Sequence, residues 1–449
     1  MSRSLRIAIA SIEYPTQPFS SGIGTYTQAL AEGLVARGHR VHVLTRGAEG
    51  NTIERDGDLR VEYVVPARAE LPERLSNSLS MAALGVRGLI GESRYRRRIA
   101  MRLHELVADE GYQLVEAADH MGEAAWYDPA RHPGVPFVVR LHTPLACSER
   151  IERNVPPWVT AVAASQERRQ VRRATHLTAP ASATVAPMLE ALRAIGRAVT
   201  VYPNPHASAL RPSRPAPEPD GPPVVLFVGR LSGWKGADTL MRAVPEVLGH
   251  FPETRFVVAG ADPGPSHGFD TYEAYLRSLL PPRAAGSVEF QGRVGHDLLA
   301  GHYRRATACV FPSRFEALGY ACLEAMSFGK AIVGSAVGGM RELLDDGNAG
   351  LLHRPPDPAD LARHIVALLG DPALRQRLGR RAFERARTRY SAERSLDAAE
   401  AFYAGAIDQL RPHATPVPRG ASRGAPVGRR PAPTRPSGPT DEASAAARR

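Results

Sequence analysis

The feature that most constrains this chain is the regular alternation of short apolar runs with helical patterns along almost its whole length. The runs are apolar on both faces of an extended strand, which is typical of strands buried between two layers of helices. The predicted strands are LRIAIA (5–10), RVHVLT (40–45), RVEYVV (60–65), QLVEAA (113–118), FVVRL (137–141), HLTA (176–179), VTVY (199–202), VVLFVG (224–229), RFVVAG (255–260), VEFQG (288–292), ACVFPS (308–313) and AIVGS (331–335). We therefore predict an α/β protein with doubly wound parallel sheets.

A proline-rich stretch divides this pattern into two halves. Between residues 203 and 223 the chain reads PNPHASALRPSRPAPEPDGPP, in which eight of the 21 residues are proline. Proline removes a backbone donor and disfavours helix, so we interpret residues 204–223 as a linker. The other predicted parts are a Rossmann-like domain over residues 1–203, a second one over 222–385, a helix over 386–410 that returns to the first domain, and a disordered basic tail over 411–449.

Length and composition set the class of protein. A chain of 449 residues with 43% hydrophobic and 23% charged residues suits two globular domains. No apolar run approaches the ~18 residues that cross a bilayer. The start, MSRSLRIAIAS, lacks the features of a secretory signal, so we expect a cytoplasmic protein. The three cysteines, Cys147, Cys309 and Cys322, have no zinc or redox spacing, and we expect small buried side chains there.

Positive charge is concentrated in two places. Of the net charge of +11, the tail from residue 411 supplies +6, from eight arginines against Asp441 and Glu442. The second place is RYRRRIAMRLHEL (94–106), where the arginines from Arg94 to Arg102 follow a helical pattern. We interpret it as a solvated basic face, with contact to an anionic membrane surface as the alternative. Nucleic acid is disfavoured, because no aromatic residues alternate with the charges.

The first glycine-rich segment is SSGIGTYTQALAEGLVARGHRVHVLT (20–45). Gly22 and Gly24 open a helix after the first strand, where glycine lets a ligand approach the backbone and the free amides favour an anion. The dinucleotide fingerprint needs a third glycine, but position 27 is threonine, and no acidic residue ends the next strand. NAD binding is therefore disfavoured, and simple turn geometry remains an alternative for this glycine pair.

The segment VVLFVGRLSGWKGADTL (224–240) places two cations after a buried strand. Arg230 follows Gly229 directly, and Lys235 precedes the next predicted helix. The carboxyl ends of parallel strands face the crevice where α/β sheets bind ligands. A guanidinium grips phosphate through two parallel bonds and an ammonium adds a point charge, so the pair is suited to neutralising a diphosphate.

The segment RFEALGYACLEAMSFGK (314–330) contains two glutamates among small and apolar residues. Glu316 lies in the loop after the strand ACVFPS, and Glu324 lies inside the predicted helix from Gly319 to Phe328. The amides of Leu318 and Gly319 start that helix and are available to a phosphate. Glu324 would accept hydrogen bonds from vicinal hydroxyls, and pairing with a nearby lysine or arginine is the alternative.

Taken together, these segments resemble the retaining glycosyltransferases of family 4, which have the GT-B fold. The resemblance rests on E-x7-E after a strand that ends in PS, on FGKAIVGS and GGMRE (338–342) that follow, on VGRLSGWKG as a phosphate-binding segment, and on VEFQGRV as a nucleobase segment. It covers residues 5 to about 410. Two departures are Ser21-Gly22, where the family usually has two glycines, and Pro203-Asn204-Pro205, where it usually has a proline-asparagine-glycine turn.

The resemblance implies a role for each site residue. Arg230 and Lys235 would hold and stabilise the departing diphosphate of a UDP or GDP sugar, and Glu316 would contact the sugar with the amides of Leu318 and Gly319 beside it. Glu324 would bind the ribose, Arg293 would frame the base, and Gly22 would approach the phosphates or the acceptor. Gly24 and Gly229 belong to the same donor-binding group. His142 matches the family's histidine near the donor sugar, and a structural core histidine is its alternative.

The resemblance also implies the reaction. A retaining hexosyltransferase would move the sugar to a sugar or lipid-linked glycan acceptor, in envelope, exopolysaccharide or glycolipid synthesis at the inner face of the membrane. We expect no cofactor and no metal, because no DxD cluster is placed to hold one and Asp345-Asp346 lies in a turn. The competing interpretations are an epimerase or phosphorylase of the same fold and a catalytically silent nucleotide-sugar-binding protein.

Overall fold

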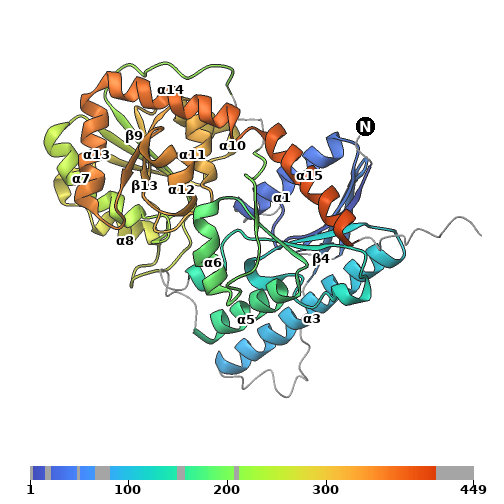
Figure 1. Ribbon diagram of the computed structural model, residues 1–449. Helices are drawn as coiled ribbons and strands as arrows, with labels where there is room; N and C mark the ends of the chain where they lie inside the picture. Colours follow the sequence, from blue (N-terminus) through green and yellow to red (C-terminus); the bar gives the residue numbers. More distant parts are fainter. Residues whose placement is uncertain are drawn as a thin grey trace, which may run out of the picture. The chain divides into compact units, whose positions relative to one another are not determined.

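The computed structural model describes residues 4–15, 22–47, 51–65, 81–148, 157–206 and 212–410 (Figure 1). In this part of the chain the strands form two sheets, of eight strands in the order β3-β4-β2-β1-β5-β6-β7-β8 and of six in the order β11-β10-β9-β12-β13-β14. Neighbouring strands pair in parallel except β3 and β4, which are antiparallel. The α/β fold class is therefore confirmed.

The strands have the following bounds: β1 Arg6–Ala10, β2 Arg40–Arg46, β3 Thr52–Asp56, β4 Leu59–Val64, β5 Leu114–Ala118, β6 Phe137–Arg140, β7 His176–Ala179, β8 Thr200–Val201, β9 Val224–Val228, β10 Arg255–Ala259, β11 Val288–Gly292, β12 Ala308–Phe311, β13 Ala331–Ser335 and β14 Leu351–His353. The helices are α1 Gly22–Ala36, α3 Met81–Ala108, α4 Leu145–Ser148, α5 Pro157–Arg173, α6 Val185–Ala191, α7 Ala237–His250, α8 Tyr272–Ser278, α9 Pro282–Ala285, α10 His296–Arg305, α11 Tyr320–Ser327, α12 Gly338–Leu343, α13 Pro358–Gly370, α14 Pro372–Thr388 and α15 Ala392–Leu410.

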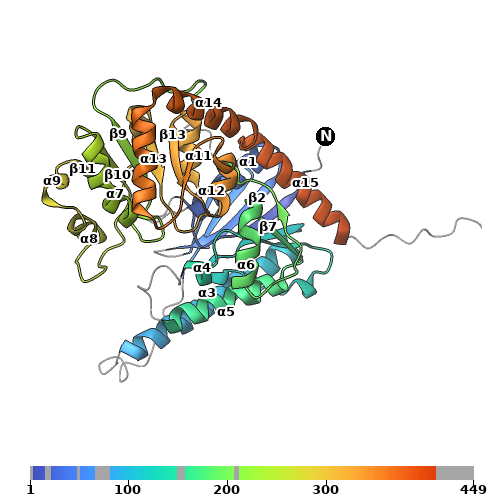
Figure 2. The same ribbon diagram turned by 60° about the vertical axis from the view of Figure 1, so that its left-hand side comes forward.

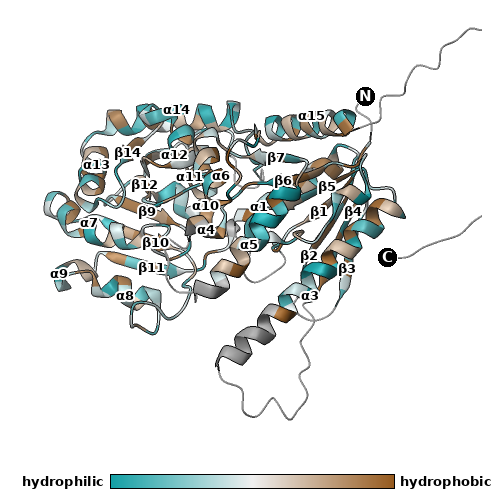
Figure 3. Ribbon diagram, turned by 60° about the horizontal axis from the view of Figure 1, so that its bottom comes forward, coloured by the Kyte–Doolittle hydropathy of each residue, from teal (hydrophilic) through white to brown (hydrophobic). Residues whose placement is uncertain are grey.

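Helices cover both faces of each sheet. In the first sheet, α3, α5 and α6 pack on one face and α1 and α15 on the other (Figure 2). In the second sheet, α7, α8 and α13 pack on one face and α10, α11, α12 and α14 on the other. Hydrophobic residues run along β1 and β9, whereas the helices alternate polar and apolar positions (Figure 3). This two-sided burial explains why most of the strands read as continuous apolar runs.

The last helix completes the core of the first sheet. Leu396 and Tyr403 of α15 are buried with α1 and the strands, and a Cβ on Gly33 of α1 would lie 2.5 Å from Cδ1 of Leu396. The hydroxyls of Tyr26 and Tyr403 donate to the two carboxylate oxygens of the fully buried Glu116, at 2.7 and 2.6 Å. A buried carboxylate without such donors would cost free energy, so these bonds tie α15 to β5.

The differences from the predicted strands have local causes. Two strands were not predicted: β3, in which every residue is exposed, and β14, which has three residues. The predicted strand 199–202 shortens to the two residues of β8. The described residues up to Leu410 form one compact unit. The domain boundaries at 203, 222 and 385 stay a prediction, and the predicted disordered tail from 411 lies outside the described residues.

We expect Tyr403→Phe to lower the free energy of unfolding by about 1–3 kcal/mol, because Oε2 of Glu116 would lose its donor inside the core. Urea unfolding followed by circular dichroism measures this loss. Tyr275→Phe is the matched control, since the Tyr275 hydroxyl makes no hydrogen bond with the described residues, and it should change the free energy by less than ~0.5 kcal/mol. Equal losses in both variants would contradict the role of the Glu116 contact.

Candidate functional site

The candidate site lies at the carboxyl ends of β9 and β12, which are neighbours in the second sheet (Figure 3). β10 lies on the other side of β9, and β13 lies on the other side of β12. The chain order therefore reverses between β9 and β12, and in α/β sheets such a switch point opens a crevice that binds ligands. Arg230 and Lys235 follow β9 and Glu316 follows β12, so the sheet brings together the two segments that the sequence analysis singled out.

Lys235 and Glu316 form an ion pair at this switch point. Nζ of Lys235 donates to Oε2 of Glu316 at 2.7 Å, and the hydroxyl of Ser313 donates to the same oxygen at 3.3 Å. The Lys235 side chain is 31% exposed and that of Glu316 is 13% exposed, so the ammonium stays accessible to a ligand. Arg230 is exposed and makes no hydrogen bond or ion pair with other described residues, which leaves a second cation available beside the pair.

Arg314 holds the two loops of the site together, a role that its position in the sequence did not indicate. Its guanidinium donates to both oxygens of Asp238 in α7, at 2.9 and 2.7 Å, and also to the carbonyl of Gly233. Its amide donates to the carbonyl of Trp234 at 2.9 Å. The fit is tight, because a Cβ on Gly236 would lie 1.9 Å from the carbonyl oxygen of Pro312. The loop that carries Lys235 is therefore fixed to the loop that carries Glu316.

The start of α11 presents unused backbone donors beside Glu316. Gly319 precedes the helix with φ of 97°, a conformation that favours glycine, and a Cβ there would lie 3.2 Å from Cγ of Glu316. Leu318 is buried through its side chain. The amides of Leu318 and Gly319 donate to no other described residue. Such free amides at a helix start can bind an anionic or hydroxyl-bearing ligand.

Glu324 is buried in α11 and contacts a tyrosine rather than a cation. The hydroxyl of Tyr303 donates to its Oε2 at 2.8 Å, so the alternative of a pair with lysine or arginine is not seen among the described residues. Burial raises the pKa of Glu324 to about 7, and the hydrogen bond from Tyr303 acts in the opposite direction. At neutral pH this carboxyl is therefore close to half protonated, and its role toward a ribose stays a prediction.

His142 follows β6 in the first sheet and is 5% exposed. Its amide donates to Oδ1 of Asp119 at 2.9 Å, and its ring lies edge-on to Tyr26 with the ring centroids 4.7 Å apart. Burial first, and then the charges of Arg140 and His120, hold the pKa of His142 well below its ordinary value. Its Nε2 is buried and has no partner among the described residues. A neutral imidazole can donate or accept a hydrogen bond through its free ring nitrogen, but it carries no charge.

His120 follows β5 and was not singled out in the sequence. Its Nδ1 lies 3.2 Å from the carbonyl oxygen of Thr143. Burial lowers its pKa, and the charge of Arg230 lowers it further while that of Glu13 raises it. A lone histidine after a strand gave no signal that could have identified it.

The remaining predicted donor-binding residues are three glycines and one exposed arginine. A Cβ on Gly22 would lie 3.4 Å from Cδ2 of Tyr320 in α11, and Gly24 is buried within α1. Gly229 packs against a neighbouring strand, since a Cβ on Gly260 would lie 1.8 Å from its carbonyl oxygen. Arg293 is exposed after the end of β11, which β10 separates from β9. The roles assigned to these residues toward a donor stay predictions.

The predicted basic face from Arg94 to Arg102 is wrong as a continuous surface. Arg96 is 4% exposed and donates to the carbonyl of Met121 at 3.2 and 3.0 Å. Arg102 forms ion pairs with Glu62 and Glu110, each at 2.9 Å. The helical pattern located the arginines on α3 but did not indicate which of them pack inward. Among the described helices, none is both long and apolar enough to cross a membrane.

Asp345 and Asp346, set aside in the sequence as a surface turn, each pair with an arginine. Asp345 pairs with Arg385 at 2.9 Å and Asp346 with Arg341 at 2.8 Å. Both carboxylates are therefore engaged in surface ion pairs. The predicted independence from metal is a separate matter and stays a prediction.

Comparison with known proteins identifies the family. Residues 21–205 match the family model described as glycosyl transferase 4-like domain, and residues 222–371 match the model described as glycosyl transferases group 1. The chain belongs to glycosyltransferase family 4. Within this family of GT-B glycosyltransferases, the first matched region contains strands β2 to β8 of the first sheet, and the second contains the whole second sheet with Arg230, Lys235, Glu316 and Glu324.

Individual relatives agree with this family over most of the chain. A glycogen synthase of Mycobacterium tuberculosis is 28% identical over 391 residues, which are 85% of this chain and 90% of the relative. A sucrose-phosphate synthase structure from Thermosynechococcus elongatus has a TM-score of 0.70 and 20% identity, covering 90% of this chain and all of the other. The Anabaena protein HepE, solved in complex with UDP-glucose, has a TM-score of 0.62 and 20% identity, covering 89% and 100%. The two structures show that this glycosyltransferase has the GT-B fold.

We expect Arg314→Ala to lower kcat by about 10–100-fold, because the loops that carry Lys235 and Glu316 would no longer be held in one geometry. Arg314→Lys should restore only part of the rate, since lysine cannot make the two parallel bonds to Asp238. Steady-state glycosyl transfer measures both. The control is Arg242→Ala, an exposed arginine on the same helix as Asp238, which should leave kcat unchanged. Equal rates for Arg314→Ala and wild type would contradict the clamp.

We expect Glu324→Gln to become more stable than wild type as the pH rises. The folded pKa of Glu324 is raised from 4.5 to about 7, so its stabilising contribution is complete below pH 4.5 and is lost as the pH rises through 7. Glutamine does not titrate. The difference in free energy of unfolding between variant and wild type should therefore grow by about 2–3 kcal/mol from pH 5 to pH 8. Urea unfolding at four pH values measures it, and a difference independent of pH would contradict the raised pKa.

Proposed function

We propose that this glycosyltransferase transfers a sugar from a nucleotide-diphosphate sugar to an acceptor hydroxyl with retention of configuration. The observation that carries the proposal is the Lys235–Glu316 ion pair at the switch point of the second sheet, with Arg230 exposed beside it. Lys235 and Arg230 supply two cations for a diphosphate, and Glu316 supplies one carboxylate for sugar hydroxyls. The solved HepE complex with UDP-glucose, on the same fold, supports a nucleotide-sugar donor.

In this mechanism the donor separates the ion pair. The diphosphate binds the ammonium of Lys235, and the sugar hydroxyls donate hydrogen bonds to Glu316. Arg230 adds a second positive charge at the leaving group. As the glycosidic bond breaks, negative charge grows on the diphosphate, and cations already in place stabilise it without reorganisation. The amides of Leu318 and Gly319 add donors beside Glu316, and His142 offers a neutral nitrogen from the first sheet.

The acceptor would lose its proton to the leaving phosphate, so we assign no protein base and no metal to the step. The acceptor class we propose is a sugar or a lipid-linked glycan of envelope or exopolysaccharide synthesis. Any contact with an anionic membrane surface would rest on the exposed Arg94, Arg97 and Arg98, because Arg96 and Arg102 have internal partners. A second candidate, a silent nucleotide-sugar-binding protein, is disfavoured by the fixed geometry of Lys235 and Glu316.

We expect Lys235→Ala and Glu316→Ala each to lower kcat/KM by about 10²–10³-fold while the far-UV circular dichroism stays unchanged, because each removes a preorganised contact to the reacting groups. A thermal-shift screen of UDP and GDP sugars identifies the donor. Nucleoside diphosphate release and NMR of the anomeric product then measure rate and configuration. Arg242→Ala is again the control. Near-wild-type transfer by either variant, or an inverted product, would contradict the proposal.

A further inference from the structure

A second cavity lies at the opposite edge of the first sheet, at the amino ends of its strands. Its volume is about 370 Å³, and it is lined by Arg6, Arg40, Arg60 and the turn 108–112 after α3. Arg6 and Arg40 are the first residues of β1 and β2, and Arg60 is the second residue of β4. The proposed donor residues, in contrast, follow the carboxyl ends of strands. The proposed glycosyl transfer does not use this cavity.

The sheet register brings the three arginines to one face. Arg6 is paired with Arg40 across β1 and β2, and Arg60 is paired with His42 across β2 and β4. Paired residues share a face, and so do residues two apart on one strand, so all three guanidinium groups lie on the face that α3 covers. Like charges directly opposite each other in a sheet are destabilising. Arg6 and Arg40 therefore form an arrangement that an anion would stabilise.

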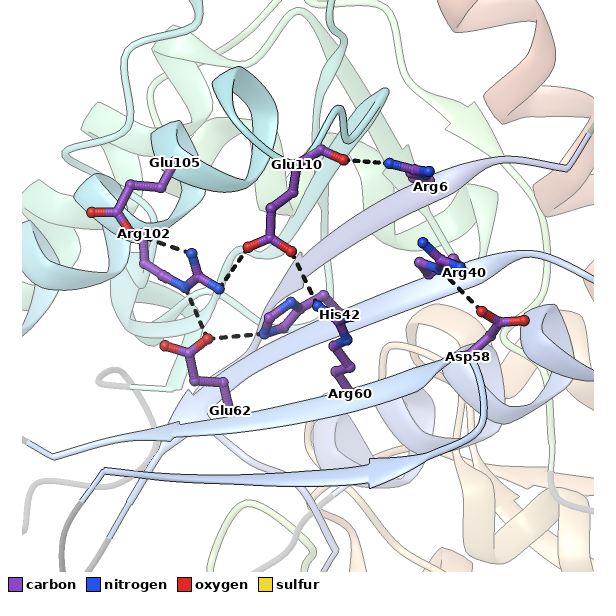
Figure 4. Close-up of polar contacts among 9 residues, drawn as sticks. All are labelled: Arg6, Arg40, His42, Asp58, Arg60, Glu62, Arg102, Glu105 and Glu110. Carbon is purple, nitrogen blue, oxygen red and sulfur yellow. Dashed lines mark hydrogen bonds and ion pairs between the residues drawn. The ribbon is translucent and has the colours of Figure 1, made fainter.

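Most of the donors of these arginines are not used by the described residues (Figure 4). Nη1 of Arg6 donates to the carbonyl of Glu110 at 2.6 Å, Nε of Arg40 donates to Asp58 at 3.0 Å, and Nη1 of Arg60 donates to Glu110 at 3.1 Å. Each guanidinium thus uses one of its three nitrogens, although it carries five N–H groups. The Arg40–Asp58 pair is 41% and 53% exposed, and such surface pairs are weak.

The acidic groups nearby balance this charge but leave guanidinium donors unused. The cavity lining carries three positive side chains against Asp109 and Glu110, and Asp58 pairs with Arg40. The carboxylate of Glu110 is shared, because Arg102 donates to its other oxygen at 2.9 Å. One carbonyl near the end of α3 is engaged as well, since that of Leu106 accepts from the amide of Tyr112 at 3.1 Å. An incoming anion would therefore meet unused guanidinium N–H groups, with the carboxylate of Asp109 at the rim as the opposing charge.

Tyr112 supplies an independent sign of a missing partner. Its residue is 2% exposed, and its hydroxyl is buried without a hydrogen bond to the described residues. Burial raises the pKa of Tyr112, the charges of Arg60, Arg40 and Arg6 act to lower it, and the charge of Glu110 acts to raise it. A buried unpaired hydroxyl costs about 1–3 kcal/mol. The hydroxyl can donate, so an acceptor-rich ligand would satisfy it together with the arginines.

We propose that this cavity binds the phosphate group of a small phosphorylated molecule, at a site separate from the nucleotide-sugar crevice. Arginine forks match phosphate oxygens with two parallel bonds, and the volume is within the usual ~300–1,000 Å³ of small-molecule pockets. The ligand is either free phosphate or a phosphate monoester of sugar size. The site would be present whether or not the donor assignment of Lys235 is right.

The test is isothermal titration calorimetry of the full chain at low salt, with inorganic phosphate and with ribose 5-phosphate as probes. We expect Arg6→Gln/Arg40→Gln to weaken the binding of both probes by at least about tenfold, since it removes two charge-assisted contacts. Tyr112→Phe keeps the packed ring and should weaken binding by about tenfold. Tighter binding of ribose 5-phosphate than of phosphate would identify a monoester ligand, and equal binding would identify the phosphate group alone as what is recognised.

Two further variants separate this site from the donor crevice. Arg242→Gln, which removes one exposed arginine of helix α7, and Lys235→Ala should both retain phosphate binding. Unchanged affinity in Arg6→Gln/Arg40→Gln and in Tyr112→Phe would overturn the proposal. So would loss of phosphate binding in Lys235→Ala, because the probe would then occupy the donor crevice. If the double arginine variant does not fold, Tyr112→Phe alone decides the matter.

Discussion

The bidentate ion pair between Arg314 and Asp238 is the contact on which the candidate site depends. Lys235 and Glu316 come from loops after different strands, and an exposed lysine held only by one glutamate would be a weak and mobile arrangement. Arg314 binds Asp238 and the carbonyl of Gly233, while Gly236 fits closely against Pro312. The two loops therefore behave as one rigid unit, and the charges that meet a ligand are positioned before it arrives.

Burial shifts the pKa values of three titratable groups at the carboxyl edges of the two sheets. Burial raises the pKa of Glu324 and of Asp119 to about 7, so their negative charge is reduced at neutral pH, and it lowers the pKa of His142, which is therefore neutral there. Lys235 is partly exposed and Arg230 is exposed. The accessible cations of the candidate site are therefore Lys235 and Arg230, and its buried groups act mainly through hydrogen bonds. This distribution suits a reaction in which negative charge develops on a leaving group.

The apolar runs were enough to predict twelve strands and the α/β class, because strands covered on both faces leave a continuous signal in the sequence. β3 left none, since its residues are all exposed. Lys235 and Glu316 were accessible to sequence reasoning because each follows a strand. The Arg314–Asp238 pair was not, because the two residues lie 76 positions apart and each looks like an ordinary surface charge. Likewise, periodicity placed Arg96 on a helix but gave no information on its inward contact with Met121.

The packing of α15 on the first sheet has a consequence for the synthesis of the chain. The strands β1, β2 and β5 emerge from the ribosome early, yet the helix that covers one of their faces ends at Leu410. Until that helix is translated, Ile7, Leu30 and Glu116 lack part of their burial and Glu116 lacks the hydroxyl of Tyr403. One face of the first sheet therefore stays partly uncovered until α15 has been synthesised. During that time a chaperone would have exposed apolar surface to bind.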